Sequence, residues 1–201
     1  AEPMYYPQGW RKHLAKAVKG TVSIPVLSVA LIRDPAYAEK LLREGVLDFA
    51  GSVRAHLADP NWAAKARTGK EEDILPCISC MACFAKYEEA GHITCAVNPC
   101  VGREAELKRA AQSKRVVIVG GGPGGLYAAW ACAVRGHQVI LLEKSDELGG
   151  NFRIASYPTG KGQLSEAIRS MIVRAEKAGA ELRVNTEATE EVLRALAPDA
   201  I

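Results

Sequence analysis

Hydrophobic positions near the start of the chain follow helical spacing in one segment and form continuous apolar runs in others. Residues 10–18 place Trp, Leu, Ala and Val at helical spacing and stop at Gly20, which predicts a helix. Apolar runs follow at 22–30 and 46–53. Because the first is rich in β-branched residues, we expect it to be a buried strand, and the second run predicts a second strand.

A helix is predicted between these two strands. Asp34 suits the N-cap, Pro35 suits the first helical position, and Gly45 follows the last turn. The residues predicted to be buried on this helix are Ala38, Leu41 and Leu42. Two short helices are predicted after the second strand, at 54–57 and 61–68.

Strand–helix–strand–helix order over residues 1–70 predicts parallel βα units. Two such units cannot bury both faces of a sheet by themselves. A complete (β/α)8 barrel has about 250 residues. We therefore expect residues 1–70 to be the C-terminal quarter of a TIM barrel.

The rest of the chain has two further parts. Residues 71–112 hold most of the cysteines and predict a cofactor loop, followed by a polar linker helix at 103–111. Residues 113–201 return to strand–helix order and predict a partial Rossmann-like FAD/NAD(P)-binding domain. Its predicted strands cover 115–119, 138–143 and 181–185, and its predicted helices cover 124–135, 163–178 and a short segment after Thr189 as N-cap.

Composition and charge exclude several function classes. The 201 residues are 48% hydrophobic and 24% charged, as in ordinary globular proteins, and acids and bases are interspersed with a net charge of +3. The sequence therefore has no basic stripe for nucleic acid and no apolar run of the ~18 residues that span a bilayer. Since no signal peptide is recognisable either, we expect a cytoplasmic protein without a nucleic-acid or membrane partner.

Both ends of the sequence read as internal. The chain starts at Ala1 without a methionine, and residues 198–201 resemble the opening of a buried strand. We expect a segment of a longer polypeptide. Alone, this segment should be unstable and inactive, because its sheet edges lack their neighbours.

Four cysteines have the spacing of a metal-cluster site: Cys77, Cys80, Cys83 and Cys95. Three thiolates from one short loop and a fourth from a more distant position are a common way to bind a [4Fe–4S] cluster. Small or apolar spacers let the loop wrap a cluster and exclude water. Six cysteines in a chain without a secretion signal also favour metal or redox chemistry over disulfides.

Two other interpretations of the cysteines remain open. Tetrahedral zinc is usually bound by paired C-x2-C segments, and here no second pair exists. The thiols could also bind nothing. Cys100, five residues after Cys95, is the residue most easily mistaken for the fourth ligand.

The glycine-rich turn after the predicted strand at 115–119 fits a dinucleotide site. Gly120, Gly122 and Gly125 satisfy G-x-G-x-x-G between a strand and a helix, and Gly124 lies within the same turn. Such glycines let the backbone approach a pyrophosphate at a helix N-terminus. A purely structural turn is the alternative.

A carboxylate stands at the end of the next predicted strand. Glu143 lies 23 residues after Gly120, the spacing of an acid that binds ribose hydroxyls. The acid favours FAD, ADP or NAD over NADP, although Lys144 beside it is the kind of residue that could accept a 2′-phosphate. Gly149-Gly150 would let a loop pass close to the ligand, unless it is a simple turn.

The loops after the last two strands of a TIM barrel commonly bind phosphate. In this chain they correspond to 30–32 and 51–54. Gly51, Ser52 and Val53 offer backbone and hydroxyl groups to an anion, and Arg54 can bind phosphate bidentately. Arginines at helix starts are also common on surfaces without any ligand.

Together these segments resemble a known family. The continuation through the cysteines, Asn98-Pro99 and the glycine turn resembles the multidomain branch of the old yellow enzyme-like NADH:flavin oxidoreductases that contains 2,4-dienoyl-CoA reductase and trimethylamine dehydrogenase. The resemblance covers essentially the whole chain in the family's order. Its barrel part rests on Ile24-Pro25-Val26, Asp34-Pro35, Glu44-Gly45, Asp48-Phe49, Arg54 and Leu57-Ala58-Asp59-Pro60.

The resemblance implies three cofactors. It implies FMN with its phosphate on Arg54 and the Gly51–Val53 backbone, and a [4Fe–4S] cluster on the four cysteines. It implies FAD, or in some members ADP, at the glycine turn and Glu143. In the reductase members NAD(P)H reduces FAD, the cluster relays electrons, and FMN reduces an activated C=C bond of an enoate or enoyl-CoA. In the amine dehydrogenase members electrons leave the substrate through FMN and the cluster.

Two departures from the family pattern concern FMN. The family often has Gly-Arg where this chain has Ala30-Leu31, and it has glycine at the position of Val53. The missing arginine weakens the expected phosphate site. The family's catalytic residues lie earlier in the barrel, so none is expected in this chain, and its nicotinamide-binding domain is expected after residue 201.

Other functions remain open beside the reductase. An amine dehydrogenase is possible within the same family. An electron-input protein resembling the small subunit of glutamate synthase also pairs cysteines with a glycine turn, but residues 22–60 read as barrel units and favour the reductase. A zinc-binding scaffold without enzymatic activity is the third alternative.

Overall fold

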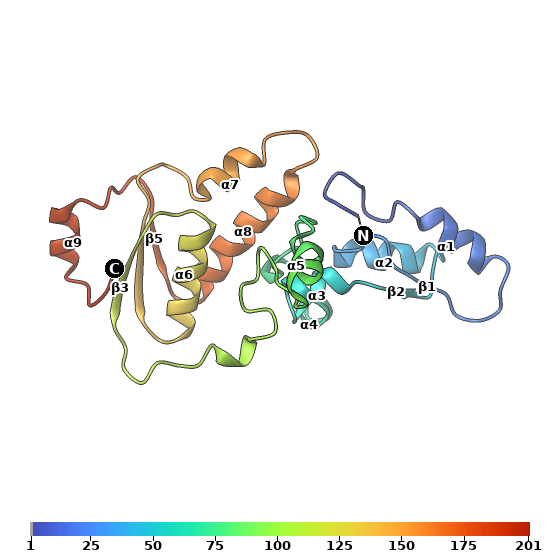
Figure 1. The fold of residues 1–201 in the computed structure, drawn as a ribbon, viewed down its shortest axis with the longest axis horizontal. Helices are drawn as coiled ribbons and strands as arrows, with labels where there is room; N and C mark the ends of the chain where they lie inside the picture. The colour runs from blue at the N-terminus through green and yellow to red at the C-terminus, as the bar shows by residue number, and fades with distance from the viewer. Residues whose placement is uncertain (1) are drawn as a thin grey trace. The chain divides into compact units, whose positions relative to one another are not determined.

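The computed structural model describes residues 2–201 and divides the chain into two compact units (Figure 1). The first unit comprises Ala1–Val101 and the second Gly102–Ile201. Both are mixed α/β structures. Each contains its own parallel sheet, of two strands in the first unit and three in the second.

The first unit contains the two predicted βα repeats and the cysteine segment. Strands β1 and β2 pair in parallel, with Leu27 opposite Phe49. The elements in chain order are α1 (Lys12–Lys19), β1 (Leu27–Ser28), α2 (Pro35–Arg43), β2 (Phe49–Ala50), α3 (Val53–Ala58), α4 (Trp62–Arg67), the 3₁₀ turn η1 (Glu71–Asp73) and α5 (Ala82–Ala90).

Both strands of this unit are much shorter than the apolar runs predicted. Each has a single partner among the described residues, so only two residues of each run form ladder hydrogen bonds. Ile24, Leu27 and Phe49 are 70%, 64% and 58% exposed. These three side chains are therefore not buried. The prediction of a buried strand over 22–30 is wrong for most of that run, in which only Val26 and Ala30 are buried.

The predicted start of α2 is confirmed. The Asp34 carboxylate accepts a hydrogen bond from the Ala36 backbone N–H at 3.0 Å, and Pro35 occupies the first helical position. Ala38 and Leu41 are buried, whereas Leu42 is 37% exposed and was wrongly assigned to the core. The cluster around this helix consists of Ala15, Ile32, Ala38, Leu41, Val46 and Leu47.

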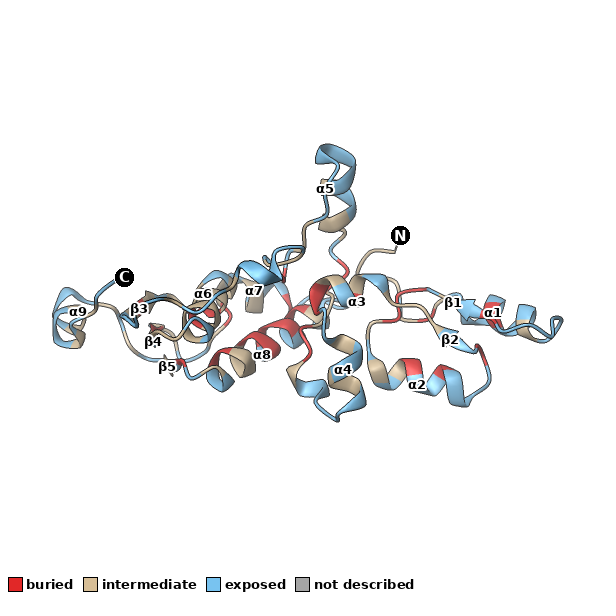
Figure 2. Ribbon diagram, turned by 90° about the horizontal axis from the view of Figure 1, so that it is seen from below, coloured by how far each residue is buried: buried red, intermediate tan, exposed pale blue. Residues whose placement is uncertain are grey.

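Two segments differ from the helices expected between the cysteines and the second unit. Helix α5 was not predicted, and none of its residues is buried (Figure 2). The linker helix predicted at 103–111 is absent, and only a 3₁₀ turn, η2 (Glu104–Glu106), forms there. Beyond it the Ala110 N–H donates to the Arg135 carbonyl at 2.9 Å, so it bonds to another segment of the chain and not to the preceding turn of a helix.

The second unit is a parallel three-stranded sheet with helices packed on it. The strand order is β3 (Arg115–Val119), β4 (Gln138–Leu142), β5 (Glu181–Arg183). Helix α6 (Pro123–Val134) packs on β3 and β4, and α8 (Gly162–Lys177) packs on α6. The buried centre contains Val117, Leu126, Ala129, Leu141, Leu142 and Ala167.

Smaller elements complete the second unit. Helix α7 (Gly150–Ala155) forms where a loop was expected, and α9 (Glu190–Leu196) begins at Thr189, whose hydroxyl accepts from the Val192 N–H as predicted. Near the end of the chain Ala200 forms a parallel bridge to Val116. No helix within residues 2–201 has the length and apolar character needed to cross a bilayer.

Candidate cofactor sites

The glycine turn between β3 and α6 has the close packing that a dinucleotide site requires. A Cβ on Gly125 would lie 1.9 Å from the Gly120 carbonyl oxygen, so only glycine fits at this position. In contrast, Cβ atoms on Gly122 and Gly124 would meet nothing within 4 Å. The turn thus packs tightly on its inner side and stays open on its outer side, where a pyrophosphate could approach.

Glu143 lies at this turn, directly after β4. Its carboxylate accepts hydrogen bonds from the Gly121 N–H at 2.7 Å and from the Ser145 N–H at 2.9 Å. It also accepts one from the Ser145 hydroxyl at 2.8 Å. The Ser145 and Gly121 backbone bonds hold the pKa of the Glu143 carboxyl below its ordinary value, so the group is an anion at neutral pH.

The loop with two glycines contacts the same turn. The Gly149 N–H donates to the Gly121 carbonyl at 2.8 Å, and a Cβ on Gly150 would lie 3.3 Å from the Gly122 Cα. These contacts bring Gly150 to the glycine turn, and its place next to a bound ligand stays a prediction. Lys144 is exposed next to Glu143.

The four predicted cluster ligands lie around one small cavity in the first unit. Mostly apolar side chains and one arginine complete its wall. The lining residues are Cys77, Cys80, Cys83 and Cys95 together with Arg54, Leu57, Ile78, Ser79, Met81, Ala96 and Val97.

The backbone of the cysteine loop is shaped to turn around this cavity. Ser79 and Met81 have φ values of +54° and +67°, the left-handed region that non-glycine residues rarely adopt. The Ser79 N–H points to the Cys77 sulfur at 3.4 Å. Strain of this kind persists where surrounding structure or function requires it.

Cys77, Cys83 and Cys95 are partly shielded from water, whereas Cys80 is exposed. Burial raises the pKa of Cys83 and of Cys95, although backbone N–H groups at Phe84 and at Val97 act in the opposite direction. Apolar cover, N–H donors to sulfur and four sulfurs at one cavity fit a cluster that accepts four thiolates. Among residues 2–201 no three His, Cys, Asp or Glu side chains converge into a group able to hold a metal ion, so the ligand set remains a prediction.

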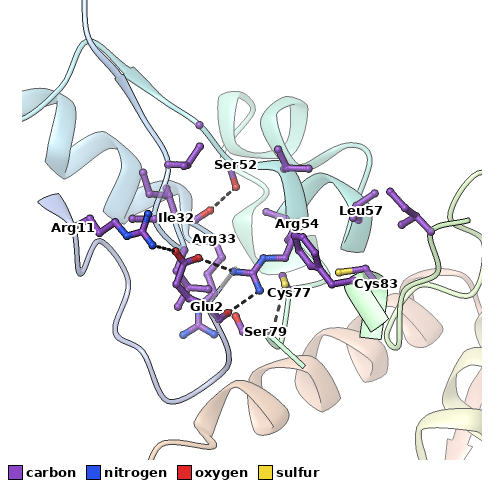
Figure 3. A pocket seen from close by; sticks show the side chains of 18 of the residues that line it. Glu2, Arg11, Ile32, Arg33, Ser52, Arg54, Leu57, Cys77, Ser79 and Cys83 are labelled. Carbon is purple, nitrogen blue, oxygen red and sulfur yellow. Dashed lines mark hydrogen bonds and ion pairs between the residues drawn. The ribbon is translucent and has the colours of Figure 1, made fainter. Parts of the chain in front are cut away.

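A larger cavity of about 510 Å³ lies next to the cysteines (Figure 3). Its wall includes both predicted phosphate loops, 30–32 and 51–54, together with the residues next to them. The Ser52 hydroxyl donates to the Ile32 carbonyl and so ties one loop to the other. Gly51 is closely packed, since a Cβ there would lie 2.6 Å from the Val29 side chain. Val53 lines the cavity although it is 69% exposed.

Arg54 connects the two cavities. Its guanidinium lines both of them and donates to the Met81 sulfur at 3.1 Å and to the Glu2 carbonyl at 2.8 Å. Its side chain is only 14% exposed. Cys77 and Cys83 also line both cavities. The structure therefore places the predicted flavin loops and the predicted cluster ligands at adjacent cavities.

Several residues of the larger cavity were not found by sequence reasoning. Glu2, Arg11 and Arg33 contribute charge, and Phe84 and Tyr87 come from the unpredicted helix α5. None of them belongs to a recognisable motif. The one signal in the sequence is Leu31, which stands where the family often has arginine. This difference could have prompted a search for other arginines.

Comparisons with known proteins agree with this arrangement. Residues 118–169 match the NAD(P)-binding Rossmann-like domain family. The chain is 43% identical to an NADH oxidase of Thermoanaerobacter brockii and 34% identical to an N,N-dimethylglycine/sarcosine dehydrogenase of Chromohalobacter salexigens, each alignment covering 98% of the chain. A solved 2-naphthoyl-CoA reductase bound to 2-naphthoyl-CoA superposes with a TM-score of 0.92 at 34% identity, over 98% of the chain.

These relatives are much longer than the chain. The chain spans 31% of the NADH oxidase, 29% of the dehydrogenase and 31% of the 2-naphthoyl-CoA reductase. All three are oxidoreductases by name. The part they share with this chain contains the cysteine segment, the larger cavity and the glycine turn.

Proposed function

We propose a function for this chain from its family, because it belongs to the multidomain branch of the old yellow enzyme-like NADH:flavin oxidoreductases. In this proposal the chain is the electron-transfer segment of a cytoplasmic NAD(P)H-dependent reductase. One observation carries the proposal. Cys77 and Cys83 line both the cavity of the four cysteines and the 510 Å³ cavity of the phosphate loops. An iron–sulfur cluster and a flavin would then be neighbours within residues 1–101.

Each cofactor has residues suited to hold it. Cys77, Cys80, Cys83 and Cys95 would ligate a [4Fe–4S] cluster. Gly51, Ser52, Val53 and Arg54 would contact the FMN phosphate, and the turn from Gly120 to Gly125, with Glu143 and Gly150, would bind FAD or ADP. When bound, these groups would supply electron relay from NAD(P)H to an activated C=C bond.

The chain's own residues would act by binding and by excluding water. Ile78 and Val97 are 3% and 2% exposed and shield the cysteine cavity on its apolar sides. Glu143 presents an anionic oxygen pair at the glycine turn, where ribose hydroxyls could donate to it. The Ser52 bond to Ile32 fixes the start of helix α3, which carries Arg54.

The substrate class of the reductase is an enoate or enoyl-CoA. The similarity to a reductase solved with an aromatic CoA ester favours this class. A second candidate is oxidation of an N-methylated amine, favoured by the 34% identity to an N,N-dimethylglycine/sarcosine dehydrogenase. In both reactions residues outside this chain would contact the substrate.

Substrate-dependent turnover separates the two candidates. The whole protein that contains this chain would be purified without air and mixed either with NADH or NADPH and cinnamate or an enoyl-CoA, or with dimethylglycine and an artificial acceptor. We expect NAD(P)H oxidation that depends on the unsaturated substrate. Amine-dependent reduction of the acceptor, without enoate reduction, would support the second candidate. If the protein shows neither activity, both candidates are contradicted.

A further inference from the structure

Two guanidinium groups hold a carboxylate in the larger cavity (Figure 3). Arg11 Nη2 lies 3.3 Å from one oxygen of Glu2, and Arg54 Nη2 lies 3.4 Å from the other. Arg54 Nη1 also donates to the Glu2 carbonyl. The Glu2 and Arg54 side chains are each 14% exposed. An anion therefore already occupies the space between these two arginines.

Arg11 is held in position from its other side. Its guanidinium lies 4.3 Å from the ring centroid of Trp10, a cation–π contact. Trp10 in turn packs against Tyr6, with ring centroids 5.0 Å apart. Because both the aromatic ring and the carboxylate fix the guanidinium, Arg11 points into the cavity although its side chain is 46% exposed.

The same cavity lacks a cation where the family pattern has one. Leu31, at the position where the family often has arginine, lines the cavity and is 8% exposed. Ala30 and Leu31 have φ values of +148° and +61°, in the left-handed half of the φ range that favours glycine. Position 31 itself supplies no positive charge, and the cations that line the cavity are Arg11, Arg33 and Arg54.

We propose that Arg11 replaces the missing arginine, and that Arg11 and Arg54 form a two-arginine site for the phosphate of FMN, which displaces the Glu2 carboxylate. This inference rests on the proposed function, which assigns the cavity to FMN. A phosphate monoester carries about −1.5 to −2 charges at pH 7 and three acceptor oxygens. It matches two guanidiniums better than a single carboxylate does.

Flavin binding tests the proposal without measuring turnover. The whole protein, depleted of FMN, is titrated with FMN and with riboflavin, and flavin fluorescence gives the two dissociation constants. The riboflavin dissociation constant divided by the FMN dissociation constant gives a ratio that reports the contribution of the phosphate alone. We expect Arg11→Ala to lower this ratio about 10- to 100-fold by loss of a charge-assisted contact, with riboflavin affinity unchanged.

The matched control is Lys12→Ala. Lys12 is the next residue, carries the same charge, is exposed and does not line the cavity, so the ratio should not change. Leu31→Arg in the Arg11→Ala background should restore the ratio. Glu2→Gln should tighten FMN and leave riboflavin unaffected, because a competing anion is removed.

Other results would overturn the assignment. An unchanged ratio in Arg11→Ala, or equal losses for FMN and riboflavin, would make Arg11 a structural residue. Weaker FMN binding by Glu2→Gln would contradict the displacement of Glu2. A wild-type protein that binds neither flavin at this site would instead contradict the proposed function itself.

Discussion

At the scale of single residues, the dinucleotide turn depends on one missing side chain and one carboxylate. Gly125 leaves room for the Gly120 carbonyl oxygen, and the Glu143 carboxylate accepts a hydrogen bond from the Gly121 N–H. The sequence motif predicted both positions because turn, helix start and acid are close in sequence. It did not predict that the acid would bond to the turn itself. That bond depends on side-chain orientation, which residue spacing does not encode.

Gly125→Ala should destabilise the protein. The added methyl would overlap the Gly120 carbonyl, and such overpacking costs about 1–3 kcal/mol. Chemical denaturation of the whole protein measures this change in the free energy of unfolding. Gly124→Ala is the matched control, because its Cβ meets no atom within 4 Å and alanine favours the helix, so this variant should not be destabilised. Equal stability of both variants would contradict the packing described here.

The Glu143 carboxylate should contribute stability that depends on pH. Its pKa in the folded protein is lowered from the ordinary 4.5 by hydrogen bonds to the charged form. This contribution is present above the unfolded pKa and is lost as pH falls through the folded pKa. The stability difference between wild type and Glu143→Gln should therefore be largest near pH 7 and shrink in acid. A difference that stays constant with pH would contradict this account.

At the scale of elements, prediction succeeded where the neighbours of an element lie within the same unit. Strand β3 was predicted at its observed bounds, and β4 and α6 within one residue. The reason is that β3, β4 and β5 pair with one another inside this unit. The runs at 22–30 and 46–53 predict strands, the first of them buried, but each pairs over only two residues. An apolar run indicates a tendency to be buried, and burial itself needs neighbours.

The N-cap of α2 should be worth a measurable amount of stability. Asp34→Ala removes the acceptor for the Ala36 N–H, and such losses cost about 0.5–2 kcal/mol. Asp34→Asn keeps an amide oxygen at the same position and should be near wild type. Thermal unfolding of the two variants side by side measures the effect. An equal loss in the two variants would show that the charge, and not the cap, matters at this position.

At the scale of the whole molecule, the sequence predicted the motifs better than the cavity. The cysteines and the glycine turn are contiguous patterns, and each was found from spacing alone. Glu2 and Arg54 are 52 residues apart, and no local pattern links them. Residues brought together only by folding, such as Arg11 beside Arg54, therefore appeared first in the structure. The same holds for the adjacency of the two cavities.

The central claim is that four particular cysteines hold an iron–sulfur cluster beside a flavin. Electron paramagnetic resonance of the chemically reduced whole protein, purified without air, tests it most directly, with iron analysis on the same samples. We predict about four iron atoms per chain and the signal of a reduced [4Fe–4S] cluster. Cys95→Ser should lose both and Cys100→Ser should keep both. Zinc without iron in the wild type, or a cluster lost in Cys100→Ser and kept in Cys95→Ser, would contradict the account.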